Sequence, residues 1–145
     1  MKTALRFTVA GVGMATMLTF ASAAFAEMQN YTATLNAASE VPPNASGGTG
    51  TLGATYDTVS RKLTYSVMFD KLTGPPAAAH FHGPAAPGAN AGVEIPVKDV
   101  SANPIKGEAT LTPAQATDLQ AGKLYFNIHT AANKGGEIRG QVVKK

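Results

Sequence analysis

Hydrophobic and polar residues alternate in short runs along most of this chain. The clearest run covers residues 63–69, where apolar side chains occupy every second position. Side chains of a strand point alternately to opposite faces, so this pattern indicates strands with one buried face. Runs of this kind, separated by Gly, Pro, Asn and Asp, predict strands over residues 31–37, 51–56, 63–69, 78–82, 93–97, 105–111, 123–130 and 137–143.

One segment, near residues 113–121, follows a helical pattern instead. Thr112 suits the N-cap, Pro113 suits the first helical position, and Gly122 suits the C-terminal cap. About eight short strands and one short helix predict an all-β fold, which we expect to be a Greek-key antiparallel β-sandwich.

The N-terminus carries the features of a secretory signal peptide. Lys2 and Arg6 lie before an apolar stretch, and residues 24–26 read Ala-Phe-Ala, a cleavage site of the A-x-A type. The stretch is short for a transmembrane helix, which needs about 20 apolar residues. We therefore expect residues 1–26 to be removed, residues 27–145 to form one domain, and the product to be periplasmic or secreted in a bacterium, with no membrane segment left.

Composition excludes several functions. Without Lys2 and Arg6, ten basic side chains balance nine acidic ones, and no basic cluster of the kind that binds nucleic acid is present. The chain has no cysteine, which removes thiolate chemistry and disulfides. The domain must therefore be stabilised by packing alone.

The three histidines of the chain lie in two predicted strands. His80 and His82 flank Phe81, and His129 ends the strand 123–130. If Phe81 faces the core, the period of two directs all three imidazoles away from it. Imidazole is a good ligand for copper and zinc, so this arrangement favours a metal site, with copper preferred to zinc. Three unrelated surface histidines are the alternative.

Other polar residues share this predicted face. Asn127 and Tyr125 alternate with the core residues of the same strand as His129, and either could orient a ligand as a second-shell partner. Glu137 could accept a hydrogen bond from an imidazole, or form a surface ion pair with Arg139. Arg139 could guide an anion toward the metal. A solvated polar surface and ordinary packing are the alternative interpretations of these residues.

Longer motifs resemble the chordin-type (CHRD) domain family. The resemblance lies in residues 31–43, 77–85, 107–112, 122–130 and 133–141, and it covers nearly all of the expected mature chain. On these motifs the chain is identified as a member of that family. The resemblance implies a β-rich domain of the kind found in animal chordins and in bacterial exported proteins.

A more distant resemblance is to copper–zinc superoxide dismutases. Residues 69–75, followed by His80-Phe81-His82-Gly83, are similar to the strand and turn that carry the copper ligands there. His129 matches a later histidine ligand, and Arg139 matches an arginine that guides superoxide. No histidine remains for a bridging or zinc position, which excludes a full copper–zinc dismutase and leaves a copper-only site with three imidazoles as what this resemblance implies.

Three functions follow as hypotheses. The first is an exported protein that binds one copper ion through His80, His82 and His129, in copper handling or simple copper redox chemistry, with another periplasmic copper protein as a partner. The second is a copper-only, dismutase-like enzyme. The third is a metal-free extracellular module that binds other proteins.

Overall fold

The computed structural model describes residues 25–145. Residues 1–24, which hold most of the predicted signal peptide, lie outside the described part. Within residues 25–145, no helix is long and apolar enough to cross a membrane.

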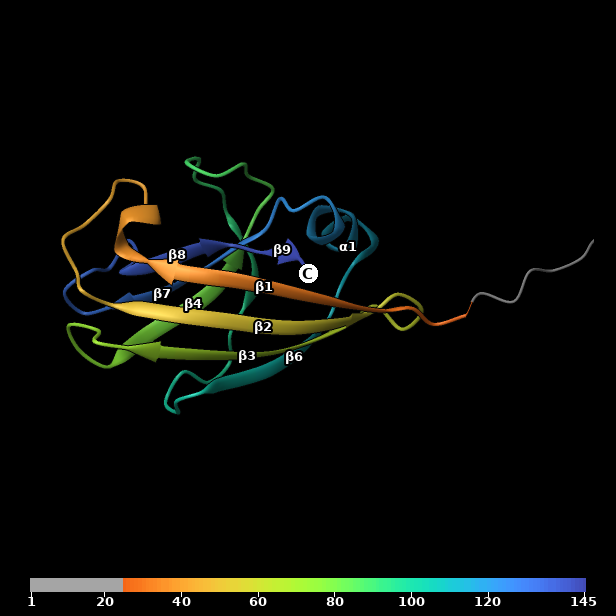
Figure 1. Ribbon diagram of the computed structural model, residues 1–145, viewed down its shortest axis with the longest axis horizontal. Helices are drawn as coiled ribbons and strands as arrows, with labels where there is room; N and C mark the ends of the chain where they lie inside the picture. The colour runs from red at the N-terminus through yellow and green to blue at the C-terminus, as the bar shows by residue number, and fades with distance from the viewer. Residues whose placement is uncertain (1–24) are drawn as a thin grey trace, which may run out of the picture.

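The described chain is built of nine strands, one α-helix and one short 3-10 helix (Figure 1). The strands are β1 (Met28–Asn36), β2 (Thr49–Asp57), β3 (Lys62–Asp70), β4 (Pro76–His82), β5 (Val93–Pro96), β6 (Ile105–Thr110), β7 (Tyr125–Thr130), β8 (Ile138–Gln141) and β9 (Val143–Lys144). The helices are η1 (Ala37–Ser39) and α1 (Pro113–Gln120). Each predicted strand is present, and the last one is divided into β8 and β9.

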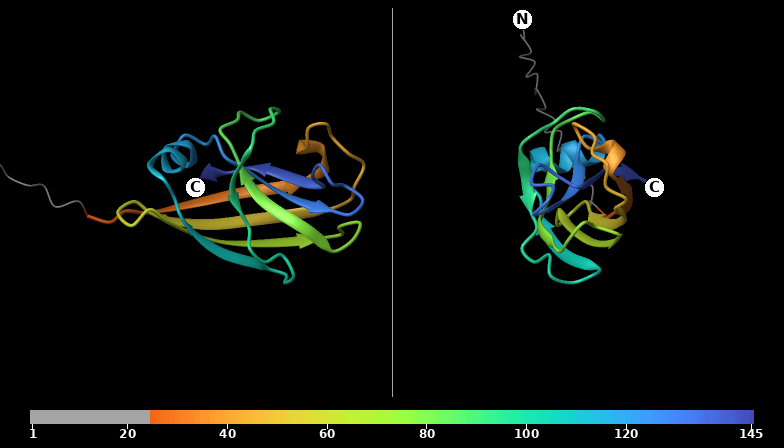
Figure 2. Two further views of the ribbon diagram at one scale, coloured as in Figure 1. Left: turned by 180° about the vertical axis from the view of Figure 1, so that it is seen from behind. Right: turned by 90° about the vertical axis from the view of Figure 1, so that its left-hand side faces the viewer.

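All strands pair antiparallel in one continuous sheet, in the order β5-β4-β7-β8-β1-β2-β3-β6, with β9 beside β1. The sheet curls until it is nearly a barrel (Figure 2). The two halves face each other across the core, where the rings of Tyr65 in β3 and Phe81 in β4 lie 5.1 Å apart. The predicted all-β antiparallel fold is confirmed, and its two layers are the halves of a single curved sheet.

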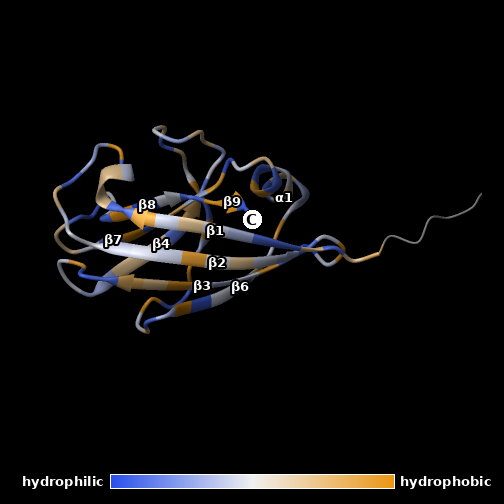
Figure 3. Ribbon diagram, in the orientation of Figure 1, coloured by the Kyte–Doolittle hydropathy of each residue, from blue (hydrophilic) through white to orange (hydrophobic). Residues whose placement is uncertain are grey.

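The alternation in the sequence explains the core. Leu63, Tyr65 and Val67 of β3 are buried, and so are Phe81 of β4 and Phe126 of β7. Figure 3 shows hydrophobic and hydrophilic residues succeeding one another along the strands, as expected when only one face of each strand packs inward.

Helix α1 begins as the sequence predicts. The Thr112 side chain accepts a hydrogen bond from the Gln115 backbone N–H, and the Gln115 side chain accepts one from the Thr112 N–H, which together form a capping box. Leu119 is fully buried against the sheet. Gly122 adopts a positive φ of 66°, the conformation that ends many helices.

Candidate metal centre

The pairing of β4 with β7 brings the three histidines together. His80 lies opposite Asn127, and Ala78 lies opposite His129, so His80 and His129 are diagonal neighbours on one face of the sheet. His80 Nδ1 and His129 Nε2 are 3.1 Å apart. One ring nitrogen from each of the three histidines lies within 4.8 Å of the other two.

Backbone carbonyl groups orient two of the imidazoles. His82 Nδ1 lies 3.0 Å from the Ala91 carbonyl oxygen, and His129 Nδ1 lies 2.9 Å from that of Lys134. A carbonyl oxygen only accepts, so each Nδ1 carries the proton and each Nε2 keeps its lone pair. Both lone pairs therefore belong to the nitrogens that face the cluster, which is the arrangement that metal ligation needs.

Burial favours the neutral form of His80 and His82. It lowers the pKa of His80 below its usual value, and the nearby His129 and His82 lower it further. Burial also lowers the pKa of His82, against a hydrogen bond to Ala91 that raises it. Neutral imidazole is the form that binds metal ions.

The donor set fits a copper or zinc ion. His82 Nε2 is buried and has no hydrogen-bond partner. Metal–nitrogen bonds of about 2.0–2.1 Å place ligand nitrogens roughly 3.3–3.6 Å apart. The pair His80 Nδ1 and His129 Nε2 is already that close, so small side-chain rotations would bring His82 into range. The contacts favour Nε2 of His82 and His129 as donors to the metal. Because His129 Nε2 accepts from His80 Nδ1 in the metal-free protein, His80 Nδ1 becomes the third donor only after its proton moves to Nε2 of the same ring.

The face that carries the histidines is covered by loops near its centre. Tyr125, Asn127 and Arg139 share this face, as the alternation predicts, but only 3%, 3% and 2% of them is exposed. The loop of residues 83–92 crosses over Tyr125 and Arg139, and its Ala91 exchanges hydrogen bonds with the Tyr125 hydroxyl. Asn127 is therefore not on a solvated surface, which was the alternative interpretation of this residue.

Tyr125 lies against a candidate ligand. Its ring stacks on the His82 ring at 4.8 Å between centroids, with an angle of 2° between the planes. The Arg139 guanidinium carbon lies 3.4 Å from the centroid of the same ring. Because β7 runs between β4 and β8, His82 and Arg139 flank Tyr125 on opposite sides. This stack holds the His82 ring in place.

Arg139 is engaged within the protein. Its Nη1 donates to Asn90 Oδ1 at 2.9 Å, and its Nη2 donates to the Ala89 carbonyl at 2.5 Å. These bonds fasten the loop 83–92 over Tyr125. The observed contacts give Arg139 a structural role, and they lend no support to a role in guiding an anion from solvent.

Glu137 is fully buried and contacts neither a histidine nor Arg139 through a hydrogen bond. Its carboxylate accepts from the Thr73 backbone and hydroxyl, from the Ser46 and Thr130 hydroxyls and from the Asn133 amide. Burial raises the pKa of Glu137, but the hydrogen bonds from Ser46, Thr130 and Thr73 outweigh this effect and lower the pKa to about 2. The residue joins three loops at one end of the sheet.

Sequence reasoning missed Glu40, which is 5% exposed and lies next to Asn127. The Asn127 side chain is within hydrogen-bonding reach of both Glu40 and His82. Only the position of Glu40 in the CHRD-like motif 31–43 could have drawn attention to it. The carbonyls of Ala91 and Lys134 were missed as well, because a backbone group leaves no signal in the sequence.

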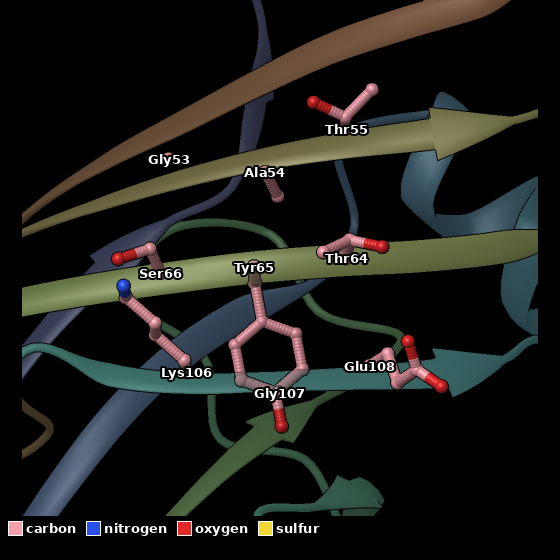
Figure 4. A pocket seen from close by; sticks show the side chains of 9 residues that line it. All are labelled: Gly53, Ala54, Thr55, Thr64, Tyr65, Ser66, Lys106, Gly107 and Glu108. Carbon is pink, nitrogen blue, oxygen red and sulfur yellow. The ribbon is translucent and has the colours of Figure 1, made fainter. Parts of the chain in front are cut away.

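A surface hollow lies away from the histidines. A depression of about 500 Å³ crosses β2, β3 and β6, and no histidine lines it (Figure 4). Tyr65 reaches over Gly107 there, and a Cβ at residue 107 would lie 2.5 Å from Tyr65 Cζ. The glycine makes room for the ring, so this hollow reflects packing between β3 and β6.

Comparison with known families gave a match over most of the described chain. The CHRD domain matches residues 31–142, which include every candidate ligand. The chain therefore belongs to the CHRD domain family. The comparisons with curated proteins and with solved structures gave no match.

Proposed function

We propose that this chain is an exported bacterial protein, periplasmic or secreted, that binds a single copper ion through His80, His82 and His129, in copper handling or simple copper redox chemistry. The observation that carries the proposal is the group of three histidines, each with a ring nitrogen within 4.8 Å of the other two, in which the buried Nε2 of His82 has no hydrogen-bond partner. Export rests on the predicted signal peptide.

Copper is preferred to zinc on chemical grounds. A set of nitrogen donors binds Cu²⁺ more tightly than the other divalent ions of the first row. Imidazole accommodates zinc as well, so zinc serves as a redox-inert probe of the same site. Superoxide dismutation is left out of the proposal, because Arg139 is buried and hydrogen-bonded to the loop above it.

The test is a copper titration of the purified protein after removal of metal with a chelator. We expect one equivalent of copper to bind, and the double variant His80→Ala/His82→Ala to lose more than about 100-fold in affinity, since ligand loss exceeds the 10- to 100-fold cost of losing an outer partner. Met68→Leu is the matched control, because Met68 is a soft donor that is 61% exposed. Its affinity should equal that of the wild type.

Two outcomes would contradict the proposal. One is a double variant that binds copper as tightly as the wild type does. The other is a wild-type protein that binds no stoichiometric metal, which would favour the alternative of a metal-free interaction module.

A further inference from the structure

Three buried polar atoms in the described chain lack a hydrogen-bond partner, and their side chains form one group. They are Glu40 Oε1, His82 Nε2 and Asn127 Oδ1. The exposed fractions of these residues are 5%, 9% and 3%. Buried polar groups are nearly always paired, so three orphans in one place call for a physical explanation.

Asn127 connects the other two residues. Its side chain is within hydrogen-bonding reach of Glu40 on one side and of His82 on the other. Its Nδ2 end lies beside Glu40: a Cβ at Gly136 would be 2.8 Å from Asn127 Nδ2 and would collide with the Glu40 carboxyl group. Gly136 thus leaves the space in which amide and carboxyl meet.

The amide has one orientation that suits a bound cation and another that suits its absence. With Nδ2 toward Glu40, Asn127 Oδ1 and His82 Nε2 are two acceptors without a donor, which is stable only if a cation occupies the His82 lone pair. After a half-turn of the amide, Nδ2 donates to His82 Nε2. Oδ1 then faces Glu40, and this contact is a hydrogen bond only if Glu40 carries a proton.

We propose that Asn127 couples metal binding at His82 to the loss of a proton from Glu40. In the metal-free protein, the Glu40 hydroxyl donates to Asn127 Oδ1, and Asn127 Nδ2 donates to His82 Nε2. When a metal ion takes the Nε2 lone pair, the amide turns, Nδ2 donates to the Glu40 carboxylate, and the Glu40 proton leaves to solvent. The inference rests on the proposed metal site.

The surroundings of Glu40 support such a proton exchange. Burial raises the pKa of Glu40 to about 7, while the charge of Arg139 from β8 and the hydrogen bond from Asn127 of β7 act in the opposite direction. Glu40 and Arg139 both line a cavity of about 420 Å³ between η1, the loop 83–92 and β8, which offers the proton a route to solvent away from the histidines. The resulting carboxylate would offset part of the charge of the metal ion.

The experiment counts the protons released when zinc binds. The pKa of about 7 belongs to the orientation in which Asn127 Nδ2 donates to Glu40. The metal-free full chain is therefore titrated with zinc by calorimetry near pH 7.5, where the carboxyl group is mostly ionised in that orientation and holds more of its proton in the other, in buffers of different ionisation enthalpy. The wild type should release roughly half a proton more than Glu40→Gln. Asn127→Ala should release as few as Glu40→Gln does, although it retains Glu40. Glu108→Gln, a change at an exposed carboxylate, should match the wild type.

Infrared difference spectra give a second measurement that needs no variant to fold. The metal-free wild type should show the C=O stretch of a protonated carboxyl group, and zinc should remove it. Equal proton release by the wild type and Glu40→Gln, with zinc bound to both, would overturn the coupling and leave the metal site intact. Undiminished release by Asn127→Ala would overturn the role of the amide. Failure of the wild type to bind zinc or copper would overturn the proposed function as well.

Discussion

Glu137→Gln should destabilise the protein in a way that depends on pH. The pKa of Glu137 is about 2 in the folded chain, against an ordinary value of 4.5. Since one pKa unit corresponds to about 1.4 kcal/mol, the ionised side chain contributes about 3 kcal/mol to the free energy of unfolding at neutral pH. The folded pKa is the lower one, so this contribution is complete above about pH 4.5 and is lost as the pH falls toward 2.

The measurement is urea unfolding of wild type and variant at pH 7 and pH 3. Glutamine preserves the shape of the side chain but places an N–H₂ group among the donors of Ser46, Thr73 and Thr130. The variant should be less stable by about 3 kcal/mol at pH 7 and by about 1.4 kcal/mol at pH 3, where the wild type has lost part of its own advantage.

Glu108→Gln is the matched control for this prediction. Glu108 forms an exposed ion pair with Lys62 at 2.6 Å, and exposed pairs contribute at most about 1 kcal/mol. A cost for Glu137→Gln that is the same at both pH values, or below about 1 kcal/mol at pH 7, would refute the assignment of the stabilisation to the ionised carboxylate.

Three further predictions concern the fold. Gly136→Ala should lower the free energy of unfolding by about 2–4 kcal/mol, because φ of Gly136 is 131° and a Cβ has no room there. Gly135→Ala is the control, because the space around Gly135 is open, and it should change the free energy of unfolding by less than about 0.5 kcal/mol. Equal effects of the two substitutions in urea unfolding would contradict this prediction. Thr112→Ala removes the helix N-cap and should cost about 1 kcal/mol, visible as a lower Tm, and an unchanged Tm would count against the cap. Phe81→Ala should lower the free energy of unfolding by about 3–5 kcal/mol, because the ring is fully buried. Val93→Ala, at an exposed position, should lower it by less than about 0.5 kcal/mol. Comparable losses of stability in the two variants would show that the core is assigned incorrectly.

Local pattern was sufficient to predict the strands and the shared face of the histidines. The period of two places Phe81 in the core and His80 and His82 on the opposite face of the strand, and this depends only on residues close in sequence. The helix could be placed for a similar reason, since Thr112 and Gly122 act on backbone groups within a few residues of themselves. The CHRD resemblance was also visible in the residues, and the family match confirms it.

The environment of that face depended on segments distant in sequence. Alternation tells which way Arg139 and Asn127 point, but not that both are buried or that the loop 83–92 folds over Arg139. For the same reason Glu137 could be taken for a surface carboxylate, although the structure surrounds it with hydroxyl donors from other loops.

The sequence by itself determined the strands, the core face and three imidazoles on the opposite face, because these follow from interactions between near neighbours. Only the tertiary structure decided that His80 and His129, 49 residues apart, lie 3.1 Å from each other, because that distance depends on the register of β4 against β7. It also decided that two carbonyl groups orient the imidazoles of His82 and His129 and that Glu40 lies close to Asn127, because these groups come to the site from loops in distant parts of the chain.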